Sequence, residues 1–231
     1  MGKVKLIVFI AALAVGLLFA NVFAFSLNIN LPRVNFFSKT RGSGNLQTEK
    51  RDVAGFSRIK ASGAVTVEVT SQKDFLVEVE ADDNLLQYVK TDVRGETLRI
   101  YTKGRFKTKN PIRVRINIPQ IESLDISGAS KAVLTNVKNE SLTLEASGAS
   151  KIAVEGETSE LKIDLSGASR IDTENLKASN VTVEASGASS AIIFADGEIN
   201  AHASGASSIR YVGEPTNVVS NTSGASSVKR R

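Results

Sequence analysis

The chain has 231 residues, a net charge of +5, four prolines, one histidine and neither cysteine nor tryptophan. Disulfide bonds and an anchor on a lipidated cysteine are therefore excluded. A net charge of this size is too small to indicate a nucleic-acid-binding protein, and we expect no nucleic acid partner.

The N-terminus carries an export signal. Lys3 and Lys5 precede an apolar run over residues 6–20, and Val22 and Ala24 fit the small-residue pattern before a signal-peptidase cut after Ala24. Residues 6–25 also have the length of a membrane-spanning helix. The sequence thus predicts that residues 1–25 form either a cleaved signal peptide or a transmembrane anchor. Both alternatives export the rest of the chain to the periplasm or cell surface, and only the anchor leaves it attached to the membrane.

Residues 26–45 are expected to be a linker, because they contain Pro32 and end in the flexible sequence Arg-Gly-Ser-Gly-Asn. The folded domain is predicted over residues 46–231. Its first part shows alternation of apolar and polar residues over 65–69, 75–79 and 112–118, which is typical of half-buried strands. Residues 82–89 form the one expected helical turn, with Asp82 or Asp83 as its N-cap.

A repeat begins near Leu124. The tetrapeptide Ser-Gly-Ala-Ser occurs six times, with its glycines at intervals of 20, 19, 20, 18 and 19 residues; these are Gly128, Gly148, Gly167, Gly187, Gly205 and Gly224. A fixed period of this length with strand-forming residues throughout indicates a β-solenoid. The predicted fold is all-β, a right-handed parallel β-helix with coils of 18–20 residues. A diverged copy at residues 62–65 places the earlier strands in the same architecture.

Alignment of the copies on the glycine predicts which side chains point inward. Apolar residues stand two, four and six positions before it and four positions after it. The last serine of each tetrapeptide shares this inward parity, so the six hydroxyls could form a buried ladder in which each bonds to the next. Alternatively, a bend at the glycine breaks the alternation and leaves these serines outside.

Two charged columns have outward parity. Acidic residues stand three positions before successive glycines and form a candidate acidic column: Asp125, Glu145, Asp164 and Glu184. His202 and Asn221 continue it, and Lys131, Lys151 and Arg170 occupy the position three after the glycine. The acidic column is either a cation-binding or docking ladder, or a structural feature whose acids pair with those bases around the corner or simply keep the face solvated. His202, the only histidine, is expected to be structural, and no metal site is expected.

A second candidate site is a basic run without acidic residues. Its cations are Lys103, Arg105, Lys107, Lys109, Arg113 and Arg115. They are either a patch for an anionic polymer or membrane headgroups, or a solvated hairpin followed by the outer side of a strand.

Several segments together resemble one known family. These are residues 51–56 (RDVAGF), residues 61–64 (ASGA) followed by alternating valines, residues 80–86 (EADDNLL), residues 95–100 (GETLRI) and the serial SGAS coils. They resemble the putative autotransporter adhesin family with a head GIN domain, over about residues 44–231. The resemblance implies a right-handed parallel β-helix at the cell envelope or surface, and it brings no catalytic motif.

The sequence therefore predicts a protein that is not an enzyme and needs no cofactor. The regular coil spacing leaves no long loops to wall a catalytic groove, and a single histidine limits acid–base constellations. We expect an exported adhesion or envelope-binding module whose partner is an anionic envelope polymer or another surface protein. A self-assembling envelope scaffold is the alternative, and a polysaccharide-processing enzyme is a third. The sequence does not determine the oligomeric state.

Overall fold

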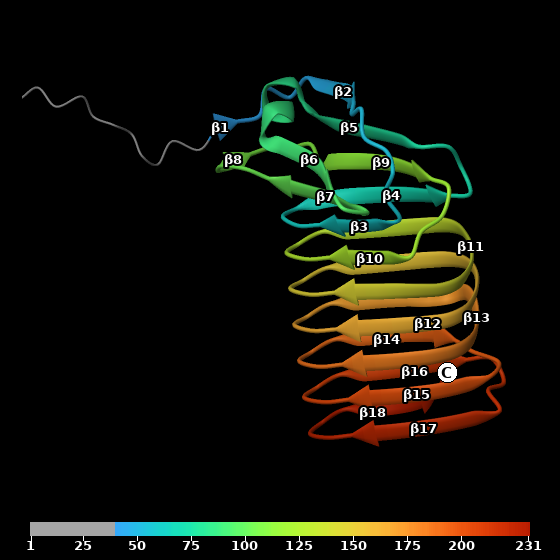
Figure 1. Ribbon diagram of the computed structural model, residues 1–231. Helices are drawn as coiled ribbons and strands as arrows, with labels where there is room; N and C mark the ends of the chain where they lie inside the picture. Colours follow the sequence, from blue (N-terminus) through green and yellow to red (C-terminus); the bar gives the residue numbers. More distant parts are fainter. Residues whose placement is uncertain (1–39) are drawn as a thin grey trace, which may run out of the picture. The chain divides into compact units, whose positions relative to one another are not determined.

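The computed structural model describes residues 40–231, which form eighteen strands and one short 3₁₀ helix (Figure 1). The predicted signal or anchor and most of the predicted linker lie outside the described residues. The first described strand, β1 (Thr40–Arg41), lies ahead of residue 46, where the sequence places the start of the domain. Within residues 40–231, no helix has both the length and the apolar character needed to cross a membrane.

The chain first builds a cap and the first coil, and then the repeat. The cap and first coil contain β2 (Leu46–Lys50), β3 (Arg58–Ala61), β4 (Val65–Ser71), β5 (Leu76–Asp82), η1 (Asp83–Tyr88), β6 (Val89–Arg94), β7 (Thr97–Thr102), β8 (Phe106–Lys107) and β9 (Ile112–Ile118). The repeat contains β10 (Ser123–Ile126), β11 (Lys131–Ala146), β12 (Lys151–Leu165), β13 (Arg170–Ala185), β14 (Ser190–Phe194), β15 (Glu198–Ala203), β16 (Ser208–Val212), β17 (Asn217–Thr222) and β18 (Ser227–Arg230). The predicted helical turn is present as η1, and Asp82 at its N-cap makes no capping hydrogen bond through its side chain.

Each coil runs along two faces that are joined at one end by the SGAS turn. The first face stacks β7, β3, β10, the second halves of β11 to β13, β15 and β17, all in parallel register. The second face stacks β9, β4, the first halves of β11 to β13, β14, β16 and β18, also in parallel. The predicted parallel β-solenoid is therefore confirmed. Antiparallel strands cover its N-terminal end, where β6 pairs with β7, β5 with β9, and β2 with β5.

The core lies between the two faces and follows the predicted parity. One coil buries Ile152, Val154, Leu161, Ile163 and Leu165, each at most 4% exposed. Burying such a side chain contributes roughly 1.5–3 kcal/mol, but only when a neighbouring coil covers it. The stack is therefore stable as a whole rather than coil by coil. The last coil departs from the pattern, because Val218, Ser220 and Thr222 in β17 are exposed.

The glycine of the SGAS turn is required for two reasons. All six glycines adopt a left-handed backbone with φ between +72° and +77°, which residues with a Cβ rarely adopt. A Cβ on any of them would also lie 2.5–2.8 Å from the carbonyl oxygen of the glycine in the preceding coil. That oxygen accepts the amide of the alanine that follows the glycine, at 2.7–2.8 Å. The stack starts at Gly63, whose carbonyl accepts Ala129 N, so the diverged copy belongs to the solenoid as predicted.

The last serine of the turn is buried, and its bonding differs from the predicted hydroxyl ladder. Ser150, Ser169 and Ser207 are at most 2% exposed. The Ser169 hydroxyl faces two carbonyl oxygens, those of Ser166 in its own turn (2.8 Å) and Ala146 in the preceding coil (3.0 Å). Ser150, Ser207 and Ser226 likewise donate to backbone carbonyls, whereas Ser189 Oγ makes no hydrogen bond within residues 40–231. The serines that donate to carbonyls therefore brace the backbone instead of one another. The inward parity was correct and the predicted bond partner was wrong.

We expect Gly167→Ala to lower the free energy of unfolding by about 2–4 kcal/mol. The substitution forces an alanine into the left-handed backbone conformation and brings its Cβ too close to the glycine carbonyl of the preceding coil. Thermal and denaturant unfolding followed by circular dichroism measure the loss. Ala168→Ser is the matched control, since Ala168 is the exposed next residue of the same turn. Equal stability of the two variants would contradict the close approach of the coils.

Candidate functional site

The basic run forms an exposed edge of the N-terminal cap. Arg105, Lys107 and Lys109 are exposed, whereas Phe106 and Thr108 between them are partly buried. The Phe106 ring packs against the core and lies 5.9 Å from the Tyr88 ring centre. Because alternate residues of an extended chain point to opposite sides, the three cations share the outer side.

A buried carboxylate fixes this loop from inside. Asp82 is 1% exposed and accepts the Thr108 hydroxyl at 2.8 Å and the Asn110 side-chain amide at 2.7 Å. A Cβ on Gly42 would lie 1.8 Å from Asp82 Oδ2, so the backbone at Gly42 packs directly on this carboxylate. The cations therefore stand on a braced segment and not on a free loop tip.

The structure adds one cation that the sequence did not reveal. β1 pairs in parallel with β8, which places Arg41 beside Lys107. The amide of Gly42 donates to the Lys107 carbonyl at 2.8 Å. We call the following five residues the cap patch: Arg41, Lys103, Arg105, Lys107 and Lys109. Nothing in the linker sequence indicates a strand that pairs with a partner 66 residues away.

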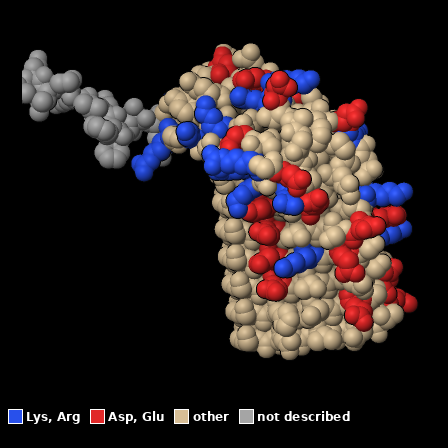
Figure 2. Space-filling view, in the orientation of Figure 1, with Lys and Arg blue, Asp and Glu red and all other residues tan. Residues whose placement is uncertain are grey.

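None of the five cap-patch cations forms an ion pair with another residue of the described part of the chain. Residues 1–39 contain no acidic residue that could pair with these cations, because the first acidic residue of the chain is Glu49. The carboxylate of Asp83 in η1 is exposed, and the hydroxyl of Ser43 and the amide of Asn84 hold its pKa below the ordinary value. Figure 2 shows Lys and Arg side chains gathered at this end of the molecule.

Arg113 and Arg115 differ from the rest of the predicted patch. They lie on β9, where Arg113 Nε is 2.9 Å from Glu68 and Arg115 is 3.1 Å from Glu80. Arg113 also pairs with Glu80 and Arg115 with Glu68, so the four residues form one network across β4, β9 and β5. The sequence pattern could not separate these two arginines from the others, because their partners come from other strands.

The candidate acidic column is in register along the first face. Asp125 pairs with Glu145, Glu145 with Asp164, Asp164 with Glu184, and Glu184 with His202 as β-ladder partners. Successive carboxylates therefore repeat at the strand spacing of about 4.8 Å. Figure 2 shows this line of acidic side chains along the solenoid.

The bases of the second column do not neutralise these acids. Lys131, Lys151 and Arg170 lie on the second face, and none of them forms an ion pair with the column in residues 40–231. Asp125 pairs instead with Lys60 of β3, which precedes it in the same ladder. The hydrogen bond and the charge of Asp125 raise the pKa of Lys60 above its ordinary value. Pairing of these acids with these bases around the corner was therefore wrong, whereas a solvated acidic face and a cation-binding or docking ladder both stay predictions.

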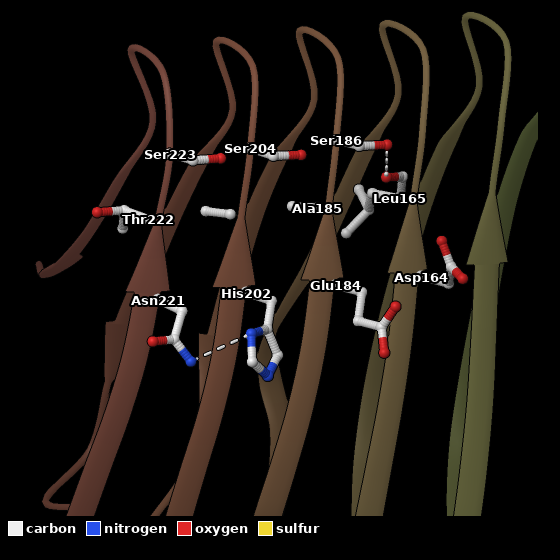
Figure 3. Close-up of a pocket in the computed structure, with 11 residues that line it drawn as sticks. Asp164, Leu165, Glu184, Ala185, Ser186, His202, Ser204, Asn221, Thr222 and Ser223 are labelled. Carbon is white, nitrogen blue, oxygen red and sulfur yellow. Dashed lines mark hydrogen bonds between the residues drawn. The ribbon is translucent and has the colours of Figure 1, made fainter.

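A shallow groove of about 310 Å³ lies along the C-terminal part of the acidic column (Figure 3). Asp164, Glu184, His202 and Asn221 form one side, and the first serines of three SGAS turns form the other. His202 Nδ1 lies 3.3 Å from the Asn221 amide nitrogen, and both side chains are exposed. Among residues 40–231 no three or more His, Asp and Glu side chains are placed to hold a metal ion.

Comparison with known proteins assigns the chain to a family. A family model described as "putative auto-transporter adhesin, head GIN domain" matches residues 55–215, more than half of the chain. The chain belongs to this head GIN domain family. No curated protein sequence matches it.

Three solved structures share the fold. A putative adhesin from Bacteroides fragilis aligns with a TM-score of 0.67 at 19% identity, over 83% of this chain and 99% of that one. A putative adhesin from Parabacteroides merdae gives 0.58 at 21% identity, over 84% and 100%. A putative lipid binding protein from Parabacteroides distasonis gives 0.52 at 17% identity, over 84% and 100%. At these identities the likeness concerns the fold of the head GIN domain alone.

Within residues 40–231 of this head GIN domain, Lys60 alone forms an ion pair with the acidic column. We therefore expect Asp164→Asn to raise the free energy of unfolding by about 0.2–1 kcal/mol at low salt. Added salt should stabilise the native chain and shrink this difference, since salt screens exposed charges. Urea unfolding at 10 mM and 500 mM NaCl measures both effects. Lys162→Gln, which removes a neighbouring cation from the same face, should have the opposite sign. A destabilised Asp164→Asn variant would contradict the repulsion.

Proposed function

We propose that this chain is an exported, non-catalytic head GIN domain protein that binds an anionic polymer of the cell envelope through the cap patch. The observation that carries the proposal is a set of five exposed cations without acidic partners at one end of a braced solenoid. Membership in an adhesin family supports an adhesion-like role and an exported or surface location.

The distribution of charge favours the same end of the molecule. Residues 40–120 contain fifteen Lys and Arg against ten Asp and Glu, whereas residues 121–231 contain ten against fourteen. The summed field of such a molecule attracts polyanions to the cap and repels them from the repeat. A binding partner that is itself negative would therefore approach the cap patch first.

The test neutralises four of the cap-patch cations together, by Lys103→Gln, Arg105→Gln, Lys107→Gln and Lys109→Gln. Each cation near an anionic surface contributes on the order of 1 kcal/mol, so we expect retention on isolated cell envelopes at low salt to fall at least tenfold. Co-sedimentation of the purified full chain with envelopes, over a salt series, measures it.

The matched control removes four cations from the solenoid, by Lys131→Gln, Lys151→Gln, Arg170→Gln and Lys177→Gln. It makes the same change in net charge and should leave retention close to that of the native chain. If both variants bind alike, or if neither loses retention, the cap patch is not the binding surface. Circular dichroism melts confirm that both variants are folded.

A second candidate function is self-assembly into an envelope scaffold. It is favoured by β17, where Val218 and Val219 are 37% and 48% exposed in the last described coil. Exposed apolar strands pair readily with other chains. Sedimentation velocity of the full chain in mild detergent should then show concentration-dependent oligomers that Val219→Lys abolishes. A strict monomer at high concentration excludes this function and leaves the binding proposal unaffected.

A further inference from the structure

The chain enters the folded domain through the cap patch. β1 is the first described strand, and its Thr40 amide donates to the Arg105 carbonyl at 3.1 Å. Figure 1 shows β1 and β8 at the end of the solenoid that lies opposite β17 and β18. Whatever residues 1–39 attach to is therefore connected to the domain beside its unpaired cations.

The sequence ahead of β1 has the composition of a membrane tether. Residues 6–25 are predominantly apolar and long enough to span a bilayer, and residues 26–39 contain Arg33 and Lys39 but no acid. The fourteen residues of this linker reach at most about 50 Å when fully extended. In a chain that keeps its apolar run, the cap patch is confined to a thin layer next to the bilayer.

We propose that the cap patch docks on the anionic phospholipid headgroups of the membrane into which the apolar run inserts. The inference goes beyond the proposed function, because it assigns to the same surface a contact with the lipid headgroups beside the tether. The solenoid then stands away from the membrane, with β17 and β18 farthest from it.

The patch is built for contact with charges and not for insertion into the lipid. Phe106 packs into the core against Tyr88, and Thr108 is bonded to the buried Asp82, so the outer side of the segment presents only cations. Contact should therefore depend on anionic lipid and weaken with salt, because exposed charges are screened at high ionic strength.

The tether and the charge asymmetry act together. A short linker raises the effective concentration of the second binding site to the millimolar range, so that a weak headgroup contact is occupied in the tethered chain. The repeat, with its excess of acidic residues, is repelled by the same surface. Attraction at one end and repulsion along the rest select a single orientation.

The absence of native cysteine permits a direct test with single labels. Gln87→Cys places a fluorophore next to Tyr88, whose carbonyl accepts the amide of Lys103, and Ala225→Cys places one in the last SGAS turn. The labelled full chain is reconstituted into vesicles of phosphatidylcholine alone or with 30% phosphatidylglycerol. Nitroxide-labelled headgroups quench a fluorophore only when it lies close to the membrane surface.

We expect quenching at position 87 to be at least threefold stronger in the anionic vesicles, to fall to the phosphatidylcholine level in 500 mM NaCl, and to stay low at position 225 throughout. The variant with glutamine at positions 103, 105, 107 and 109 should show equal quenching in the two kinds of vesicle. The control variant with glutamine at positions 131, 151, 170 and 177 should still show stronger quenching in the anionic vesicles. Equal quenching in both vesicles, or quenching that survives the cap-patch substitutions, overturns the inference.

Co-sedimentation with isolated envelopes, compared with quenching on pure lipid vesicles, separates this inference from the proposed function. A chain that co-sediments with envelopes through the cap patch but shows no quenching on anionic vesicles has a polymer partner, which contradicts lipid docking and keeps the proposed function. A chain that neither co-sediments with envelopes nor shows quenching on anionic vesicles contradicts both the proposed function and lipid docking.

Discussion

Successive coils of this solenoid approach so closely at the SGAS turn that no Cβ fits between them. The glycine carbonyl of one coil faces the glycine of the next, and the alanine amide bonds to that carbonyl. The approach sets the parallel register of both faces, because a shift of one residue would bring a side chain into the gap. The core alternation, the buried serines and the outward columns all follow from this register.

The same register converts a repeat in sequence into rows of equal side chains. Glu145, Asp164 and Glu184 follow Asp125 along the first face, and this row of acids ends at His202. In the cap the strands come from distant parts of the chain, so opposite charges meet there instead, as in the network of Arg113 and Arg115 with Glu68 and Glu80. Repetition favours like-charged rows, and irregular pairing favours ion pairs.

This contrast explains how much the sequence could predict. The solenoid, its inward positions and the acidic column all depend on the regular spacing of the SGAS repeats. Such a spacing can be recognised in the sequence without knowledge of the fold. The split of the basic run could not be predicted, because Arg113 meets Glu80 only through the antiparallel pairing of β5 with β9. Arg41 was missed for a similar reason, since β1 joins β8 across 66 residues with no signal in either segment. The serine hydroxyls were assigned the wrong partners because parity places a side chain inside without saying which oxygen lies nearest.

The uniform SGAS turns also bear on how such a protein changes length. Each repeat coil offers the next one the same glycine carbonyl and the same row of inward aliphatic side chains. Duplication or deletion of one coil therefore preserves the backbone contacts of the SGAS turn and alters the height of the stack by about 4.8 Å. The cap is not interchangeable in this way, since its strands pair in both directions. Evolution can thus adjust how far the distal coil stands from the cap in small, nearly neutral increments.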